Sequence, residues 1–211
     1  PVPASAGTVV AETDHTDIDA RSVDFPGGVR LNTKATDFDA KQVQVAIHFG
    51  RGRQTEPAEG LALVAETVVR ESGVGKLSRE QLEAALAGTN VKLEFHAGAE
   101  SFVLTGSALA GGLELLLQLA YARLHDPAFR DEALARSREQ LRQMYEQMAS
   151  SVEGMQHLQG ERIPGGGGRE YGLPAWESVE RVTLAQVEEW LRPAFATAPL
   201  EIDIVGAIDP K

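Results

Sequence analysis

The sequence has no cysteine, few aromatic residues and no surplus of positive charge. Without cysteine the chain forms no disulfide and offers no thiolate for catalysis or metal binding, and this leaves the compartment open. With 20 basic against 31 acidic side chains the net charge is −11, so the basic face that binds nucleic acid is missing and no nucleic-acid partner is expected. The apolar stretches fall short of the ~18 residues that cross a bilayer, so no membrane partner is expected either.

What is present is the composition of an ordinary folded protein. A chain of 211 residues with 43% hydrophobic and 24% charged residues can bury one hydrophobic core without disulfides or a structural metal. Residues 1–21 mix small, polar and acidic residues without a period, which predicts a linker or disordered arm, and residues 22–211 are expected to form a single domain. The missing initial Met and the ending Ala207-Ile208-Asp209-Pro210 favour a fragment of a longer chain.

Alternating apolar residues predict the strands. Val43, Val45, Ile47 and Phe49 alternate strictly, and the segment 29–33 after the Pro-Gly-Gly turn is expected to pair with this strand. Two further strands around 91–95 and 102–104 are joined across a turn, and a last strand covers 202–205. The spacing of apolar residues between these segments changes from two to that of a helix.

Helical spacing begins at Gly60, and two capping boxes, opened by Ser78 and Thr183, predict the starts of two more helices. Other helices are expected at 113–124 and 131–150. This order of elements predicts an α+β fold, a mostly antiparallel (mixed) sheet with helices packed on one face.

Five short stretches, in this order and spacing, resemble a known family over residues 22–210. They are Phe25-Pro26-Gly27-Gly28-Val29-Arg30-Leu31, Gly60-Leu61-Ala62, Asp126-Pro127-Ala128-Phe129, Arg169-Glu170-Tyr171-Gly172-Leu173-Pro174 and Leu200-Glu201-Ile202-Asp203-Ile204-Val205-Gly206. The chain thereby resembles the repeated domain of the pitrilysin/insulinase family of inverted zinc metallopeptidases, to which subunits of the mitochondrial processing peptidase are also similar. The resemblance implies tandem copies of this domain arranged as two bowls around a closed proteolytic chamber.

In active members of the family, the helix that resembles Gly60-Leu61-Ala62 continues into H-x-x-E-H, and a third ligand, a glutamate, follows roughly 75 residues later. Here the stretch is Leu63-Val64-Ala65-Glu66-Thr67, and the position of the third ligand falls near Met144. Only Glu66 matches, at the place of the general base. The resemblance therefore implies no metal site and no catalytic residue in this domain, with zinc expected on another domain of the parent.

The remaining candidates for chemistry are weaker. The five histidines, His15, His48, His96, His125 and His157, form no i, i+3 or i, i+4 pair, so surface or hydrogen-bonding roles are favoured over metal binding. Glu66 is favoured as a carboxylate on the surface of its helix. The stretch Gly165–Gly168 lacks a phosphate-binding pattern and is expected to be a surface connection.

The resemblance also implies what the domain contacts. Inactive domains of the family help to hold substrate, so Arg169 and Tyr171 are candidate substrate-binding residues, and the expected partners are peptide and the other peptidase-like domains of the parent. Two alternatives stay open. One is a catalytically active peptidase domain with an unorthodox metal site near Glu66, and the other is an assembly module like the core subunits of respiratory complexes. Long members of the family are often bacterial and exported, which favours a periplasmic or exported location.

Overall fold

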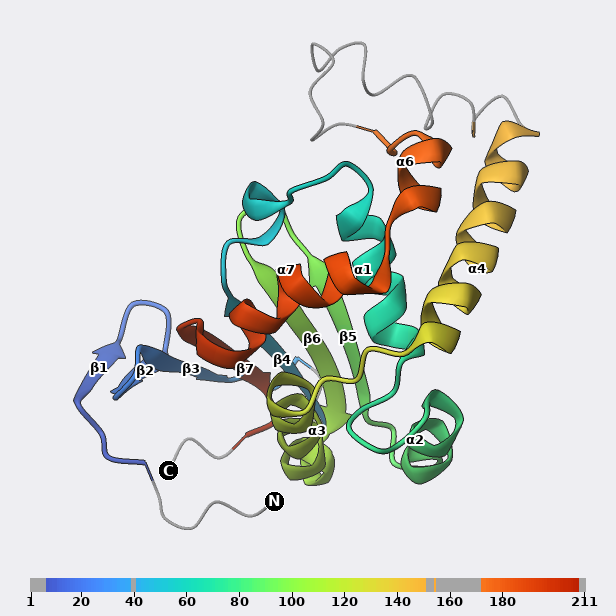
Figure 1. Cartoon of the computed structure of the whole chain (residues 1–211). Coiled ribbons are helices and arrows are strands. Elements are labelled where there is room, and N and C mark those ends of the chain that lie inside the picture. The colour runs from blue at the N-terminus through green and yellow to red at the C-terminus, as the bar shows by residue number, and fades with distance from the viewer. Residues whose placement is uncertain (1–6, 39–40, 151–153, 155–171, 209–211) are drawn as a thin grey trace.

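Seven strands form one mixed sheet with the order β1-β2-β3-β7-β4-β6-β5 (Figure 1). The computed structural model describes residues 7–38, 41–150, 154 and 172–208. The strands are β1 (Ala11–His15), β2 (Ala20–Phe25), β3 (Val29–Ala35), β4 (Gln42–Phe49), β5 (Lys92–Ala97), β6 (Phe102–Leu109) and β7 (Leu200–Gly206). The β3–β7 pair is parallel and the other neighbours are antiparallel.

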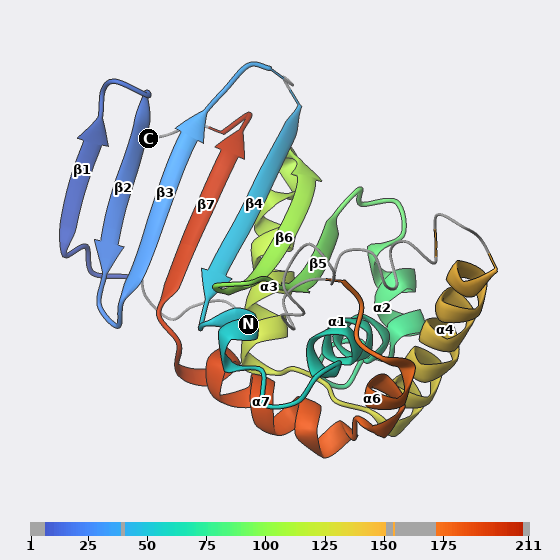
Figure 2. The ribbon, with the colours of Figure 1, turned by 90° about the horizontal axis from the view of Figure 1, so that it is seen from above.

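The helices lie on one face of this sheet and beyond its β5 edge (Figure 2). Those in the described residues are α1 (Leu61–Glu71), α2 (Arg79–Leu86), α3 (Leu113–His125), α4 (Asp131–Ala149), α6 (Trp176–Arg181) and α7 (Leu184–Thr197), with short 3-10 turns η1 (Gly52–Thr55) and η2 (Ala110–Gly112). The alternating residues of β4 are buried beneath the helices, and the residues between them face the open side. The predicted α+β fold, with helices on one face of a mostly antiparallel sheet, is confirmed.

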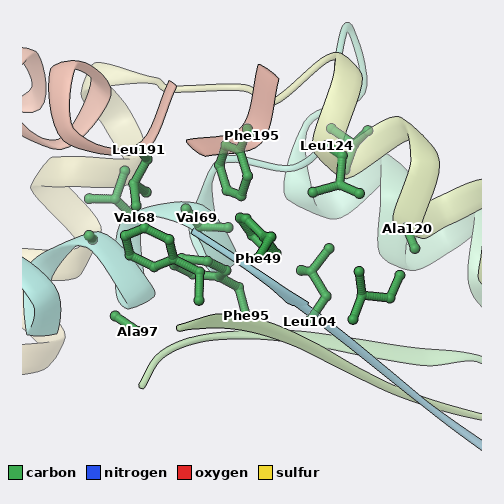
Figure 3. Close-up of a cluster of buried hydrophobic side chains, with 14 of the residues drawn as sticks. Phe49, Val68, Val69, Phe95, Ala97, Leu104, Ala120, Leu124, Leu191 and Phe195 are labelled. Carbon is green, nitrogen blue, oxygen red and sulfur yellow. The ribbon is translucent and has the colours of Figure 1, made fainter. Parts of the chain in front are cut away.

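Aromatic rings form the centre of the core between the sheet and α7. Phe49, Phe95, Phe102 and Phe195 stack and tilt against one another with ring centroids 5.4 to 6.4 Å apart. Figure 3 shows aliphatic side chains of α1 and α7 closing around these rings. Such pairs add about 0.5–1.5 kcal/mol each beyond the burial of their area, so this cluster fixes α7 on the sheet.

One predicted strand pair is wrong. The segments 29–33 and 43–49 are both strands, but β7 lies between them, parallel to β3 and antiparallel to β4. The alternation of apolar residues indicates a strand and its buried face but not its neighbour. The long helical stretch before β7 supplies the connection that parallel pairing requires, and the apolar Ile202 and Ile204 suit a central strand.

The prediction of a linker or disordered arm over residues 1–21 is also wrong for its second half. Residues 11–15 form β1, which pairs with β2, and the Arg21 guanidinium contacts the carboxylate of Glu12 across the hairpin. β1 is the edge strand and is exposed on both faces, so its sequence shows no apolar alternation. Residues 1–6 lie outside the described part of the chain.

The helix starts agree well with the capping boxes. Ser78 and Thr183 each accept a hydrogen bond from the backbone of the third residue of their helix, and the Gln at that position bonds back. The six-residue α6 was not expected, because it is too short to show a helical period. No helix of the described ranges is long and apolar enough to cross a membrane.

Candidate functional site

Helix α1 carries Leu63-Val64-Ala65-Glu66-Thr67, the stretch that the resemblance aligns with the zinc-binding motif. It begins after Gly60, whose φ of +89° and close approach to the backbone of Val179 both favour a residue without a side chain. Thr67 is buried, and its hydroxyl donates to the Leu63 carbonyl oxygen at 3.1 Å. Leu63 packs against the core from a partly buried position. Neither side chain offers a nitrogen or carboxylate ligand for zinc.

Helix α4 carries Met144, near which the resemblance places the third ligand. The Arg70 guanidinium donates to the Gln140 side chain at 3.2 Å, so the two helices meet there, and beyond Gln140 α4 runs alongside the earlier turns of α1 (Figure 1). One turn after Gln140, Met144 is half-buried and packs against the core. Within the residues that the structure describes, no group of three or more His, Asp and Glu side chains could hold a metal ion.

Glu66 was expected to be a solvated carboxylate on the surface of its helix, but it is not freely solvated. It is half-buried, and its Oε1 accepts a hydrogen bond of 2.7 Å from the backbone N–H of Ala97, at the end of β5. Burial raises the pKa of the Glu66 carboxyl above its ordinary value, and the Ala97 N–H, His96 and Arg53 offset part of this effect. The side chain therefore joins α1 to the last strand of the sheet.

Two hollows meet at Glu66. The smaller, of about 110 Å³, lies between α1 and Gly172-Leu173-Pro174. The larger, of about 400 Å³, lies between β5 and α2, and we call it the β5–α2 groove. The predicted substrate-binding residues Arg169 and Tyr171 lie outside the described residues, but the chain that follows them lines the smaller hollow.

The outer edge of β5 is the second feature of the site. β5 is the last strand of the sheet, and its ladder partner is β6. The N–H of Ala97 points away from β6 toward Glu66, and backbone groups two and four residues earlier share this direction because antiparallel pairing alternates. The backbone groups of Phe95 and Leu93 therefore face the β5–α2 groove, an arrangement that suits an added strand.

Neither this groove nor the arginine that borders it was predicted from the sequence. Arg123 on α3 is 6% exposed and borders the groove. The sequence does contain a signal for this arginine. Position 123 follows Leu116 and Ala120 at helical spacing, so a cation lies on an apolar helix face. Strand adjacency, which creates the groove, was not visible in the sequence.

Each histidine of the described ranges has polar neighbours of its own. Their polar neighbours are Ser22 for His15, Ser101 and Asp203 for His48, Glu94 for His96 and the Tyr121 carbonyl oxygen for His125. His157 is outside the described residues.

Comparison with curated proteins gives distant relatives. The chain is 24% identical over 184 residues to the chloroplastic stromal processing peptidase of Pisum sativum and 24% identical over 185 residues to that of Oryza sativa subsp. indica. These matches cover 85% of this chain but 15% of the relatives, so the chain spans a small part of their length. No protein-family model matches the sequence.

Solved structures give a closer match in shape. The ferredoxin protease FusC, in complex with Arabidopsis ferredoxin, superposes with a TM-score of 0.78 at 17% identity, covering 99% of this chain and 23% of that one. The periplasmic protease PqqL of Escherichia coli gives 0.78 at 19% identity, with the same coverage. A peptidase M16 inactive domain from Pseudomonas fluorescens gives 0.72 at 18% identity, covering 90% of this chain and 47% of that one.

The identities are low, and what these structures share with the chain is the whole arrangement of sheet and helices. The predicted resemblance is thus confirmed at the level of the fold: the chain has the domain fold of the M16, or pitrilysin-type, metallopeptidases.

Proposed function

We propose that this chain is a catalytically inactive domain of a zinc metallopeptidase, which forms part of the wall of a proteolytic chamber and helps to hold peptide substrate. The observation that carries the proposal is the pairing of two features around Glu66. The helix that bears zinc ligands in active members has Leu63 and Thr67 in their place, while the neighbouring β5 edge turns the backbone groups of Leu93 and Phe95 toward the groove.

The absence of the three ligands argues against chemistry in this domain. A catalytic zinc needs three protein ligands and an open position, and one acidic side chain cannot hold the ion alone. One of the two Glu66 oxygens, Oε1, is in addition engaged with the Ala97 N–H. Zinc, in this proposal, is bound by another peptidase-like domain of a longer protein.

The low coverage of the relatives supports a longer parent, since the chain matches about a quarter of FusC and of PqqL. The other domains of that parent are then the partners of this one. We place the parent in the periplasm or outside a bacterial cell, as PqqL is a periplasmic protease. Fractionation of cells that express the parent tests this location.

Peptide capture by the β5 edge can be tested on the chain itself. Leu93→Pro removes a backbone N–H that faces the groove rather than β6, so it should leave the ladder intact while preventing strand addition. Leu93→Ala removes a similar amount of side chain but keeps the N–H, and serves as the matched control. Fluorescence anisotropy with a labelled unstructured peptide should give binding to the wild type and the alanine variant, and little to the proline variant.

Equal binding by the two variants would remove the β5 edge from the proposal. If a folded chain binds no unstructured peptide at all, the alternative of a pure assembly module is favoured.

A further inference from the structure

The β5–α2 groove contains a cation that the proposed function does not use. Arg123 on α3 lines this groove, and Figure 2 shows α2 beyond the β5 edge of the sheet. Its Nη1 donates to the carbonyl oxygens of Val69 and Gly73 at 2.7 and 2.6 Å. These are the guanidinium's only hydrogen bonds to described residues. The carbonyls belong to the end of α1, whose dipole stabilises the cation without neutralising it.

Apart from Lys92, the other charged groups that border the groove have partners. Arg79 is bound by Glu71 and Glu83, and Arg70 lies 3.6 Å from Glu71. Glu66 accepts from Ala97, and Glu94 lies 3.7 Å from His96. Among the described residues, Arg123 and Lys92 are the cations of this groove that form no ion pair.

Burial makes the unpaired state of Arg123 costly. Desolvation lowers the pKa of the guanidinium to about 10, which still leaves it charged at neutral pH. A buried charge with no counterion is an unfavourable arrangement unless something else supplies the opposite charge. Arg123 keeps 6% of its surface exposed, and it lines the β5–α2 groove.

We propose that Arg123 is the recognition site for a carboxylate side chain of the peptide that pairs with β5. The inference rests on the proposed function, because it assumes that a peptide occupies the β5 edge. An added strand would point alternate side chains toward the helices, on the side of the groove where Arg123 lies. Leu82, Leu86 and Leu93 supply apolar walls around this position, and exposed Lys92 adds a second cation at the rim. A peptide with Asp or Glu at one such position is therefore preferred.

The test compares two labelled peptides that differ only by Glu or Gln at one central position, with the position moved along the peptide in a small series. At those positions of the series whose side chains point toward the helices, the wild-type chain should bind the Glu peptide about tenfold more tightly than the Gln peptide. This is the difference expected for a charge-assisted hydrogen bond to a carboxylate. Equal affinity for Glu and Gln peptides at every position overturns the carboxylate site and leaves peptide capture standing. Binding of neither peptide overturns the proposed function as well.

Direct removal of Arg123 risks the end of α1, so the decisive variants leave it in place. Leu82→Glu brings an internal carboxylate into the groove, and Leu82→Gln is the matched neutral control. Leu82→Glu should lose the preference for the Glu peptide and should melt at a higher temperature than Leu82→Gln, because the internal carboxylate neutralises Arg123. If Leu82→Glu keeps the tenfold preference, or melts no higher than Leu82→Gln, Arg123 is not an anion site.

Discussion

The buried carboxylate of Glu71 should be one of the largest single electrostatic contributions to the stability of this domain. Glu71 is 1% exposed, and both its oxygens accept from Arg79 at 2.5 Å, while Gln140 of α4 donates to Oε1 at 3.1 Å. Arg70 and Arg136 lie 3.6 and 3.4 Å away. This cluster joins the end of α1 to α2 and α4, and so sets the wall of the β5–α2 groove.

Glu71→Gln keeps the shape and removes the charge. Breaking a buried ion pair on one side costs about 3–5 kcal/mol, and the lower end applies because the arginine side chains are 34–61% exposed and can be rehydrated. A loss of about 3 kcal/mol corresponds to a melting temperature lower by about 6–12 °C in a domain of this size. The control is Glu83→Gln, which removes an exposed pair with the same Arg79 and should cost under about 1 kcal/mol.

The effect should depend on pH with a definite sign. Burial alone would raise the pKa of Glu71, but the hydrogen bonds from Arg79 and Gln140 outweigh it and hold the pKa below its ordinary value. A carboxyl with a lowered folded pKa contributes stability above its unfolded pKa, and this is lost as the pH falls through the folded value. At pH 7 the melting temperature of the wild type should exceed that of Glu71→Gln by the full amount, and this difference should shrink below about pH 4. An unchanged melting temperature for Glu71→Gln at pH 7 would refute the reasoning.

Two further predictions concern the positions of zinc and substrate. Leu63→His, Thr67→His and Met144→Glu together should create one weak zinc site, because positions 63 and 67 share one face of α1 and α4 packs alongside α1. Zinc titration should raise the melting temperature, and Met144→Ala in place of Met144→Glu should abolish this rise. The graft should cost stability, on the order of 2 kcal/mol or more for the lost packing of Leu63 alone. A folded triple variant without a zinc-dependent shift would show that the register of the two helices is wrong. Replacing Arg169 and Tyr171 by Ala should leave the melting temperature almost unchanged and weaken peptide capture by the parent enzyme; unchanged peptide kinetics would make them ordinary surface residues.

Local signals in the sequence predicted most of the elements, because each depends on neighbouring residues. The capping boxes at Ser78 and Thr183 and the alternation from Val43 to Phe49 depend on hydrogen bonds and burial within a few residues. Strand order depends on contacts between distant segments, and the insertion of β7 between β3 and β4 has no local signal. The edge strand β1 was missed because exposure on both faces removes the alternation on which the prediction depends.

The candidate site also has features that were predictable from neighbouring residues and features that depend on contacts between distant segments. The resemblance located Glu66, Leu63 and Thr67 on one helix, because the motif is contiguous in sequence. It could not show that Glu66 bonds to the end of β5, since residues 66 and 97 meet only after the sheet has formed. Arg123 was visible as a charge on an apolar helix face, but its missing counterion is a property of the packed structure.

The most direct test of the central claim is the zinc content of the purified chain. The chain should be purified without chelator, exposed to zinc and desalted, and its metal measured by elemental analysis. With Leu63 and Thr67 where active members have ligands, the result should be far below one zinc per chain. One tightly held zinc per chain, with chelator-sensitive peptide cleavage that Glu66→Gln abolishes, would contradict the assignment of this domain as inactive.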